Sequence, residues 1–289
     1  MNWPGIVCPY NPSLFATFTG LTVAARVPHQ GQAAEAAARV QESGNELLCV
    51  IVESDSPFDE IELADDLQSL PLAVMAPTWG KFRQLAQRLP RLRDFNLRVY
   101  LPAHHPQNIA GLRILSSLGI HTCAVLGDGP QDWEGLTDLM TYALLGQGPH
   151  ASMEPFVFIA SNYDPTSYLE WGSIYFDDPR RFLHLDADGR VALSPAELRQ
   201  QRFVAQSLAE IGTPSQFPVI QQRAQAWRDF FLNNHPCASC GGWKICLGKF
   251  ARERKKNGGC RAFFQEMLEV AREYQEKNVP PVEPRIWQP

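Results

Sequence analysis

The sequence lacks the features that place a chain in a membrane or mark it for export. No apolar stretch approaches the roughly 20 residues that a membrane-spanning helix needs. The N-terminus begins Met1-Asn-Trp-Pro-Gly and has no basic segment followed by an apolar run, so no signal peptide is expected. These absences predict a cytoplasmic protein without a membrane partner.

An excess of positive charge is also missing. The chain has 26 Lys and Arg against 31 Asp and Glu, which gives a formal net charge of -5. Nucleic-acid binding requires a surplus of cations to neutralise phosphates, so no nucleic-acid partner is expected. The sequence contains no G-x-G-x-x-G and no P-loop, and therefore gives no indication of a bound nucleotide.

The remaining composition is ordinary for a globular protein, with 45% hydrophobic and 20% charged residues. A chain of 289 residues can bury a sizeable core and suits one large domain with a smaller appendage. The seven cysteines are an odd number, and four of them have the spacing of metal ligands. This pattern is typical of reduced cysteines in the cytoplasm and does not indicate a disulfide framework.

Those four cysteines lie close together near the C-terminal end, as Cys237-x2-Cys240-x5-Cys246-x13-Cys260. The two-residue gap lets both thiolates of one tight turn reach the same metal centre, and the other two cysteines can complete a four-sulfur shell. Glycine permits sharp turns that bring backbone N–H groups close to sulfur. The glycines beside the cysteines are Gly241, Gly242, Gly258 and Gly259. Reduced core cysteines are the competing interpretation, but core cysteines do not have ligand spacing.

The spacing alone does not choose the metal. Zinc and a 4Fe–4S cluster both accept four cysteine ligands. At this point the two remain open.

The segment 170–270 resembles the SPASM domain, the auxiliary-cluster domain of radical SAM enzymes that modify peptides. The family's last block runs C-x2-C-x5-C-x3-C and is followed by a distant cysteine. Cys237, Cys240 and Cys246 match its first three cysteines, and Cys260 matches the distant one. The resemblance implies that these four residues hold one auxiliary 4Fe–4S cluster. Aromatic side chains nearby in the sequence could shield it, namely Trp243, Phe250 and Phe263.

The departures from the family are consistent with one another. Phe250 stands where the family has the x3 cysteine, and the hairpin segment from Asp186 to Ser194 lacks the cysteine that usually ends it. Both missing ligands belong to the family's first auxiliary cluster. The C-x3-C-x2-C motif of the catalytic cluster is absent as well, so SAM cleavage is not expected. The isolated cysteines that remain are Cys8, Cys49 and Cys123. The chain is thus similar to the SPASM-domain companion proteins of GeoRSP-type peptide-maturation systems.

The first part of the chain alternates between short apolar runs and helical patterns. Strands are expected over 21–27, 47–53, 71–76, 97–101, 120–126 and 156–160, preceded by a short strand at 5–8. Helices are expected over 31–43, 58–69, 81–89, 108–118 and 132–145, with Asp132 as N-cap of the last and the third ending before Pro90.

Such strand–helix steps predict a parallel sheet with right-handed crossovers. A closed barrel needs eight units and about 250 residues, whereas only about 140 residues carry the pattern. We therefore predict an α/β fold with an open partial (β/α)5–6 barrel, the shape of radical SAM cores. A doubly wound, flavodoxin-like sheet is the alternative.

The chain is expected to divide into a partial-barrel domain at 1–165, a SPASM-like auxiliary-cluster domain at 166–278 and a proline-rich tail at 279–289. The second domain opens with a hairpin whose strands, 182–186 and 190–193, flank an Asp-Gly turn. It continues with helices over 195–211, 218–233 and 262–277. The result is a small β-hairpin plus helix domain carrying the four-cysteine metal site.

Sites in parallel α/β folds lie at the carboxyl ends of the strands. The polar residues expected there are His29, Glu53, Thr78, His104, His105, Asp128 and Asn162. The pair His104-His105 suggests a site, but adjacent loop residues seldom bind one metal, and a polar loop is favoured. Two carboxylates without a nucleophile or base do not define a reaction. The basic run 249–256 fits either a solvated helix face or a docking patch for an acidic partner.

The resemblance to SPASM-domain companion proteins therefore implies a non-catalytic iron–sulfur accessory protein. It would bind one 4Fe–4S cluster through Cys237, Cys240, Cys246 and Cys260, and assist a radical SAM maturase by relaying electrons or presenting its peptide substrate. Two alternatives are a stand-alone enzyme with a site at the barrel mouth and a zinc-binding interaction scaffold. The expected partners are a radical SAM/SPASM enzyme, its peptide substrate, or both.

Overall fold

A computed structural model describes residues 4–127, 129–251 and 259–277. Its centre is one sheet with the strand order β7-β6-β5-β4-β3-β2-β1-β8-β9. The strands are β1 (Gly5–Pro9), β2 (Thr22–Val27), β3 (Glu46–Glu53), β4 (Leu72–Met75), β5 (Leu97–Pro102), β6 (His121–Val125), β7 (Met153–Glu154), β8 (Phe182–Leu185) and β9 (Val191–Ala192).

Helices connect the parallel strands, and further short helices and α12 follow the last strand in the sequence. Those of the described residues are α1 (Pro12–Phe15), α2 (Ala33–Glu42), α3 (Phe82–Leu92), α4 (Pro106–Ser117), α5 (Trp133–Leu145), α6 (Phe156–Asn162), α7 (Pro195–Arg199), α8 (Leu208–Ile211), α9 (Pro218–Ala224), α10 (Arg228–Leu232), α11 (Trp243–Cys246) and α12 (Gly259–Glu276). No helix within the described ranges is long and apolar enough to cross a membrane.

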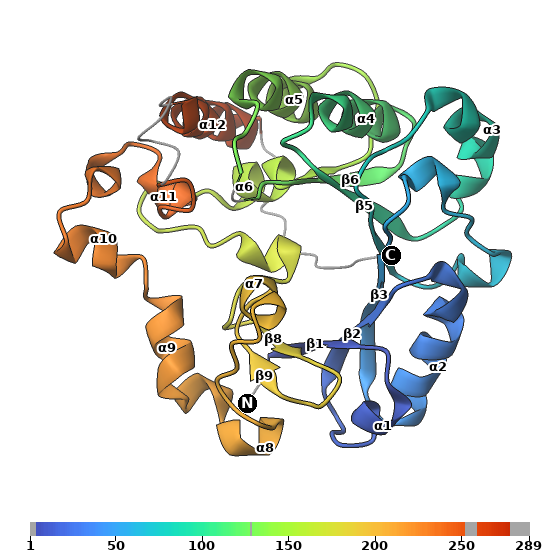
Figure 1. Cartoon of the computed structure of the whole chain (residues 1–289). Coiled ribbons are helices and arrows are strands. Elements are labelled where there is room, and N and C mark those ends of the chain that lie inside the picture. The colour runs from blue at the N-terminus through green and yellow to red at the C-terminus, as the bar shows by residue number, and fades with distance from the viewer. Residues whose placement is uncertain (1–3, 128, 252–258, 278–289) are drawn as a thin grey trace.

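The strands from β1 to β7 follow one another in the sheet in chain order, and every pair among them is parallel. A doubly wound sheet would reverse its strand order part-way, so the flavodoxin-like alternative is wrong. The sheet is curved, with α2, α3, α4 and α5 along its outer side (Figure 1). This arrangement is compatible with an open partial barrel.

The strand predictions succeeded where an apolar run is buried on both faces. The middle of β3, from Cys49 to Val52, is fully buried, as expected for a strand covered on both faces of the sheet. Helix α2 ends where predicted, because Gly44 at φ 76° reverses the chain. Asp132 caps α5 as predicted, by accepting a hydrogen bond of 3.0 Å from the backbone N–H of Gly135.

The strand expected at 156–160 is wrong. These residues form helix α6, and the pairing with β6 is made by Met153 and Glu154, as β7, ahead of Pro155. The carboxylate of Glu154 accepts a hydrogen bond of 2.9 Å from the backbone N–H of Phe158 and so supports the first turn of the helix. A short, continuously apolar run suits a buried helix as well as a buried strand, and its periodicity does not distinguish them.

Several predicted helices are also wrong in length. The segment 58–69 forms two 3-10 turns, Phe58–Glu60 and Asp65–Leu67, and both 195–211 and 218–233 break into two short helices. Helix α3 continues past Pro90 to Leu92, which is buried. A proline in the last turn removes only one hydrogen bond near the helix end, and burial of Leu92 favours continuing the turn.

The predicted hairpin exists, but it is part of the main sheet. β8 and β9 pair antiparallel, with His184 opposite Ala192, while β8 also pairs parallel with β1. Asp186 closes the turn by accepting hydrogen bonds from the backbone N–H groups of Asp188 and Arg190. Because β8 lies beside β1, the segment that follows the hairpin starts from one edge of the sheet.

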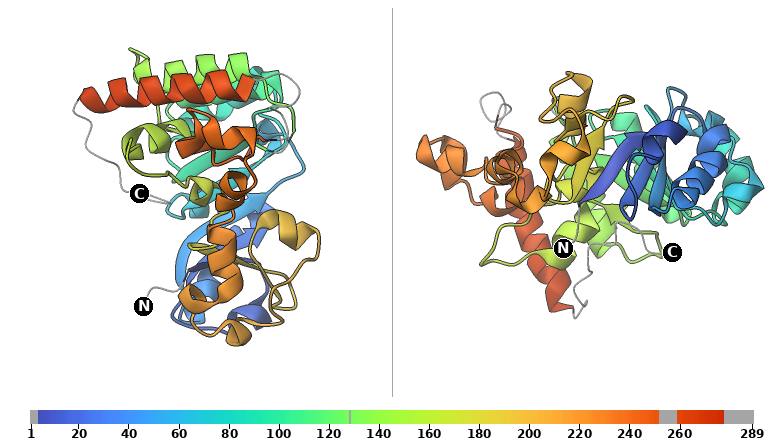
Figure 2. Two further views of the ribbon diagram at one scale, coloured as in Figure 1. Left: turned by 90° about the vertical axis from the view of Figure 1, so that its left-hand side faces the viewer. Right: turned by 90° about the horizontal axis from the view of Figure 1, so that it is seen from below.

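The C-terminal helix α12 packs against α5 and α6, on the outside of the sheet (Figure 2). Its buried side chains include Phe263, Phe264 and Met267, and Phe263 lies 5.4 Å from the ring of Trp133 on α5. Each such side chain contributes roughly 1.5–3 kcal/mol on burial. This packing fixes the start of α12, and with it Cys260, relative to the α/β part of the molecule.

Candidate metal centre

The four cysteines of the predicted site line one small cavity. Cys237 belongs to a 3-10 turn (Pro236–Ser239), Cys240 follows that turn, Cys246 ends α11 and Cys260 lies in the first turn of α12. The other lining residues are Trp243, Phe250, Arg261 and Phe264. Three separate pieces of chain thus contribute cysteines to the lining of one cavity.

The first two cysteines are held by a tight turn, as their spacing predicts. The backbone N–H of Cys240 donates to the carbonyl of Cys237 at 3.0 Å. The ring Nδ1 of His235 accepts a hydrogen bond of 3.1 Å from the backbone N–H of Cys237. Pro236, at the first position of the turn, has no N–H that would need a partner. These contacts fix the direction in which the turn presents its cysteines.

A left-handed turn follows Cys246. Leu247 and Gly248 have φ angles of 49° and 78°, and the N–H of Lys249 donates to the carbonyl of Cys246 at 3.0 Å. A Cβ atom at Gly248 would lie 2.7 Å from the ring of Phe230, so this position needs glycine for its conformation and for its space. The turn directs the backbone N–H groups of Gly248 and Phe250 at the Cys246 sulfur.

The glycine-rich sequence predicts N–H groups near sulfur, but the glycine that supplies one is Gly248 and not one of the four named above. Gly242 instead allows close packing, because a Cβ atom there would lie 2.5 Å from the Cβ of Phe264. Gly258 lies outside the described residues. The sequence signal for this turn is a glycine two residues after Cys246, because a glycine in the left-handed conformation commonly ends a helix.

Burial raises the pKa of the Cys246 thiol to about 11, and the backbone N–H groups of Phe250 and Gly248 oppose this shift. The neighbouring thiols of Cys260 and Cys237 raise the pKa further, since two thiolates close together repel. Cys246 is therefore protonated at neutral pH in the metal-free chain. Binding a metal as thiolate would release this proton.

One polar atom beside the cavity has no partner. Trp243 is 4% exposed, and its indole Nε1–H is buried without a hydrogen bond in the described part of the chain. A buried donor left unsatisfied costs about 1–3 kcal/mol. Sulfur atoms of thiolates or of a cluster are acceptors that such a donor could use. The orphaned N–H therefore fits a sulfur-rich group in this cavity.

Aromatic side chains shield the cavity, although not all those expected. Trp243 and Phe250 line it as predicted, whereas Phe264 takes the place predicted for Phe263. The helix turns by about 100° per residue, so only one of the two adjacent phenylalanines can face the cysteines. Phe250 is 4% exposed, and its ring lies 5.0 Å from Trp133 in an edge-on contact. Phe250 thus fills space beside the cysteines with an apolar ring.

The thiols of the described chain are not gathered as closely as a single ion requires. Among the described residues, no group of three or more His, Cys, Asp or Glu side chains is arranged to hold one metal ion. Zinc–sulfur bonds of about 2.3 Å in a tetrahedron place the sulfurs about 3.8 Å apart. A cluster with an iron behind each thiolate holds its ligands farther from one another.

The residues expected at the barrel mouth are not brought together. His104 and His105 are exposed, and their rings lie 4.1 Å apart on the loop before α4. Burial and the neighbouring His105 lower the pKa of His104. Neither histidine is among the described residues that line the cavity of about 410 Å³ at the carboxyl ends of the strands, whereas Glu53 is. Asp128 lies outside the described residues.

The other polar residues expected at this end are also dispersed. His29 is exposed, the carbonyl of Thr78 accepts from the N–H of Phe58, and the amide of Asn162 donates to the carbonyl of Phe158 within α6. These contacts stabilise local structure. Most of the basic run, 252–256, falls outside the described residues, and Lys249 pairs with Glu170 at 3.3 Å.

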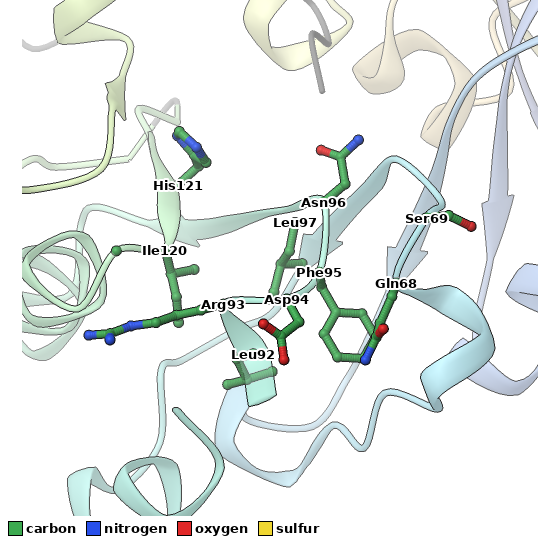
Figure 3. A pocket seen from close by; sticks show the side chains of 11 residues that line it. Gln68, Ser69, Leu92, Arg93, Asp94, Phe95, Asn96, Leu97, Ile120 and His121 are labelled. Atoms are coloured by element: carbon green, nitrogen blue, oxygen red, sulfur yellow. The ribbon is translucent and has the colours of Figure 1, made fainter. Parts of the chain in front are cut away.

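A further cavity, of about 350 Å³, lies at the amino ends of β5 and β6. The side chains drawn in Figure 3 do not converge on one point. Arg93 donates to the carbonyl of Leu118, and His121 bonds the hydroxyl of Ser152 at 2.7 Å. Residues at the amino ends of barrel strands generally serve stability, and these contacts agree with that role.

Comparison of the chain with protein-family models, with curated proteins and with solved structures finds no match.

Proposed function

We propose that this protein is an iron–sulfur accessory protein that holds one 4Fe–4S cluster through Cys237, Cys240, Cys246 and Cys260. The observation that carries the proposal is the convergence of these four cysteines, from three pieces of chain, on one cavity. The cysteine pattern of the SPASM family supports it independently. The SPASM-like domain that holds the site would comprise residues 166–278, next to a partial barrel at 1–165.

The surroundings of the cavity suit an anionic, sulfur-rich group. The N–H groups of Gly248 and Phe250 and the orphaned N–H of Trp243 are donors for sulfur, and Arg261 at the lining contributes positive charge. With four protein ligands, a cluster would have no open iron for substrate and would supply electron transfer or structural stabilisation. The chain's part is to bind the cluster, exclude water with Phe250 and Phe264, and bias its potential.

The remaining cysteines support a non-catalytic role. Cys8, Cys49 and Cys123 are buried on three different strands, β1, β3 and β6. Burial raises the pKa of Cys8 to about 12, and that of Cys123 well above its ordinary value. Such thiols serve packing and are poor ligands or nucleophiles. With no C-x3-C-x2-C motif in the sequence, the proposed work is to assist a radical SAM maturase in a reducing, cytoplasmic compartment.

The test is an anaerobic assay with a radical SAM/SPASM enzyme and its peptide substrate. The cluster-loaded protein is expected to bind the enzyme or the peptide and to raise the yield of modified peptide. Cys240→Ala should lose this effect together with the cluster, whereas Cys123→Ala should keep both. Protein with an intact cluster that binds neither enzyme nor peptide would contradict the accessory role while leaving the metal centre in place.

A further inference from the structure

A second cavity, of about 410 Å³, lies inside the curve of the sheet at the carboxyl ends of the strands. Its lining comes from β1 to β6, β8 and α7, so nearly the whole α/β part of the molecule contributes to it. Cavities of this size at this edge of a parallel sheet are common ligand sites. None of the four cysteines of the metal centre lines it.

Two arginines from distant parts of the chain meet at this cavity. Arg26 stands near the end of β2, and Arg199 is the last residue of α7. Both also act on His184 on β8, whose pKa is lowered chiefly by burial and further by these two guanidinium groups. The guanidinium groups of Arg26 and Arg199 therefore belong to residues that line the same cavity and act on the same histidine.

The guanidinium of Arg26 is poorly satisfied by the chain itself. Its Nη2 donates to the carbonyl of Leu185 at 3.3 Å, and its Nη1 lies 3.7 Å from the carboxylate of Glu53, beyond hydrogen-bond distance. Its Nε–H is buried and has no partner in the described chain. A half-buried guanidinium with one long hydrogen bond and one distant ion pair retains most of its capacity for an anion.

Arg199 is also available. It is exposed, and its side chain forms no hydrogen bond or ion pair with any residue in the described ranges. Glu197, two residues earlier in α7, forms its ion pair with Arg223. Because α7 follows the hairpin directly, its last turn holds Arg199 over the end of the sheet.

The remaining walls are largely apolar. Val7, Ile51, Met75 and Val125 supply aliphatic surface from four strands. The hydroxyl groups of the two lining tyrosines are already engaged as donors, Tyr100 to the carbonyl of Ile174 at 3.3 Å and Tyr175 to that of Ala124 at 2.8 Å. Glu53 and Asp177 also line the cavity, and their carboxylates would repel an anion. An anion is therefore expected to bind beside the arginines.

We propose that this cavity binds an organic carboxylate, with the carboxylate held between Arg26 and Arg199 and an apolar body on the strand side chains. A planar carboxylate matches the paired N–H groups of a guanidinium, which gives arginine its preference for this group. The carboxylate can belong to a free organic acid or to the end of a peptide. The proposal does not depend on the metal centre.

The test is isothermal titration of the full chain with 3-phenylpropionate and with its neutral amide, 3-phenylpropanamide. The acid is expected to bind and the amide to bind at least tenfold more weakly. A tetrapeptide ending in phenylalanine, with a free or an amidated C-terminus, distinguishes the two sources of carboxylate. Binding of only the free-ended peptide would assign the site to a peptide end, and binding of the small acid would assign it to free acids.

Arg199→Gln is expected to weaken binding about tenfold or more, because a charge-assisted hydrogen bond is lost. Arg26→Gln should act in the same direction, and Arg202→Gln is the matched control, since Arg202 is exposed and does not line the cavity. Arg199 is at the surface, so its variant should fold even if that of Arg26 does not. Equal binding of acid and amide, or binding of neither acid nor peptide by the folded protein, would overturn the proposal.

Discussion

Acid should destabilise this protein through one buried histidine, His184. It is 2% exposed on β8, and its Nε2–H donates to the carbonyl of Phe176 at 2.7 Å. Burial lowers its pKa to about 4, against 6.5 for an exposed imidazole. Because the folded-state pKa lies below the unfolded-state value, the stability is fully present above pH 6.5 and is lost as the pH falls toward 4.

The size of the loss follows from the two pKa values. At pH 5 the unfolded imidazole is almost fully protonated and the folded one is almost neutral, which costs about 2 kcal/mol of unfolding free energy. At pH 4 the cost reaches about 3 kcal/mol. Since carboxylates also titrate in this range, the comparison must be made with a variant in which only this group has changed.

His184→Gln is that variant, because its side-chain amide is uncharged at every pH and can still donate to a carbonyl. Urea unfolding at pH 7.5 and at pH 5 should show that the native protein loses about 2 kcal/mol more than the variant. His29→Gln, at an exposed position, should behave as the native protein does. An equal loss in the native protein and in His184→Gln would refute the assignment.

Two further substitutions test the local structure, each with a matched control. Asp132→Ala should cost about 1 kcal/mol in thermal unfolding, because it removes the N-cap of α5, whereas Asp138→Ala on the exposed side of the same helix should cost little; equal effects would contradict the cap. Gly248→Ala should lower the iron content of purified protein, since its Cβ would strike a ring and its φ of 78° disfavours alanine. Gly241→Ala, which meets nothing closer than 3.4 Å, should leave the iron content unchanged, and full iron content in Gly248→Ala would show that this turn does not support the site.

Most strands of the parallel sheet could be predicted from the sequence because each is a short run of largely buried, apolar side chains. The run at 156–160 has the same composition, and only its tertiary surroundings make it a helix. The placement of β8 beside β1 was also beyond reach, since it depends on pairing between segments far apart in the chain. Local sequence patterns therefore predict where a strand or helix forms better than they predict which strand it pairs with.

For the candidate metal centre, the spacing predicted four cysteine ligands, and the structure places these four residues on the lining of one cavity. Phe264 lines the cavity and Phe263 does not, because of the rotation of α12 about its axis. The turn at Gly248 depends on the path of the chain after Cys246. The spacing of the cysteines specifies neither of these. Arg26 and Arg199 carry no sequence signal at all, because the fold alone brings them to one cavity.

The most direct test of the central claim is the iron, acid-labile sulfide and zinc content of anaerobically purified protein, read with its ultraviolet–visible spectrum. We expect about four irons and four sulfides per chain, lost in Cys237→Ala and Cys260→Ala and retained in the buried control Cys8→Ala. One zinc without sulfide would contradict the iron–sulfur assignment and leave only the four-cysteine site. Iron that persists when Cys237 or Cys260 is removed would contradict the ligand assignment.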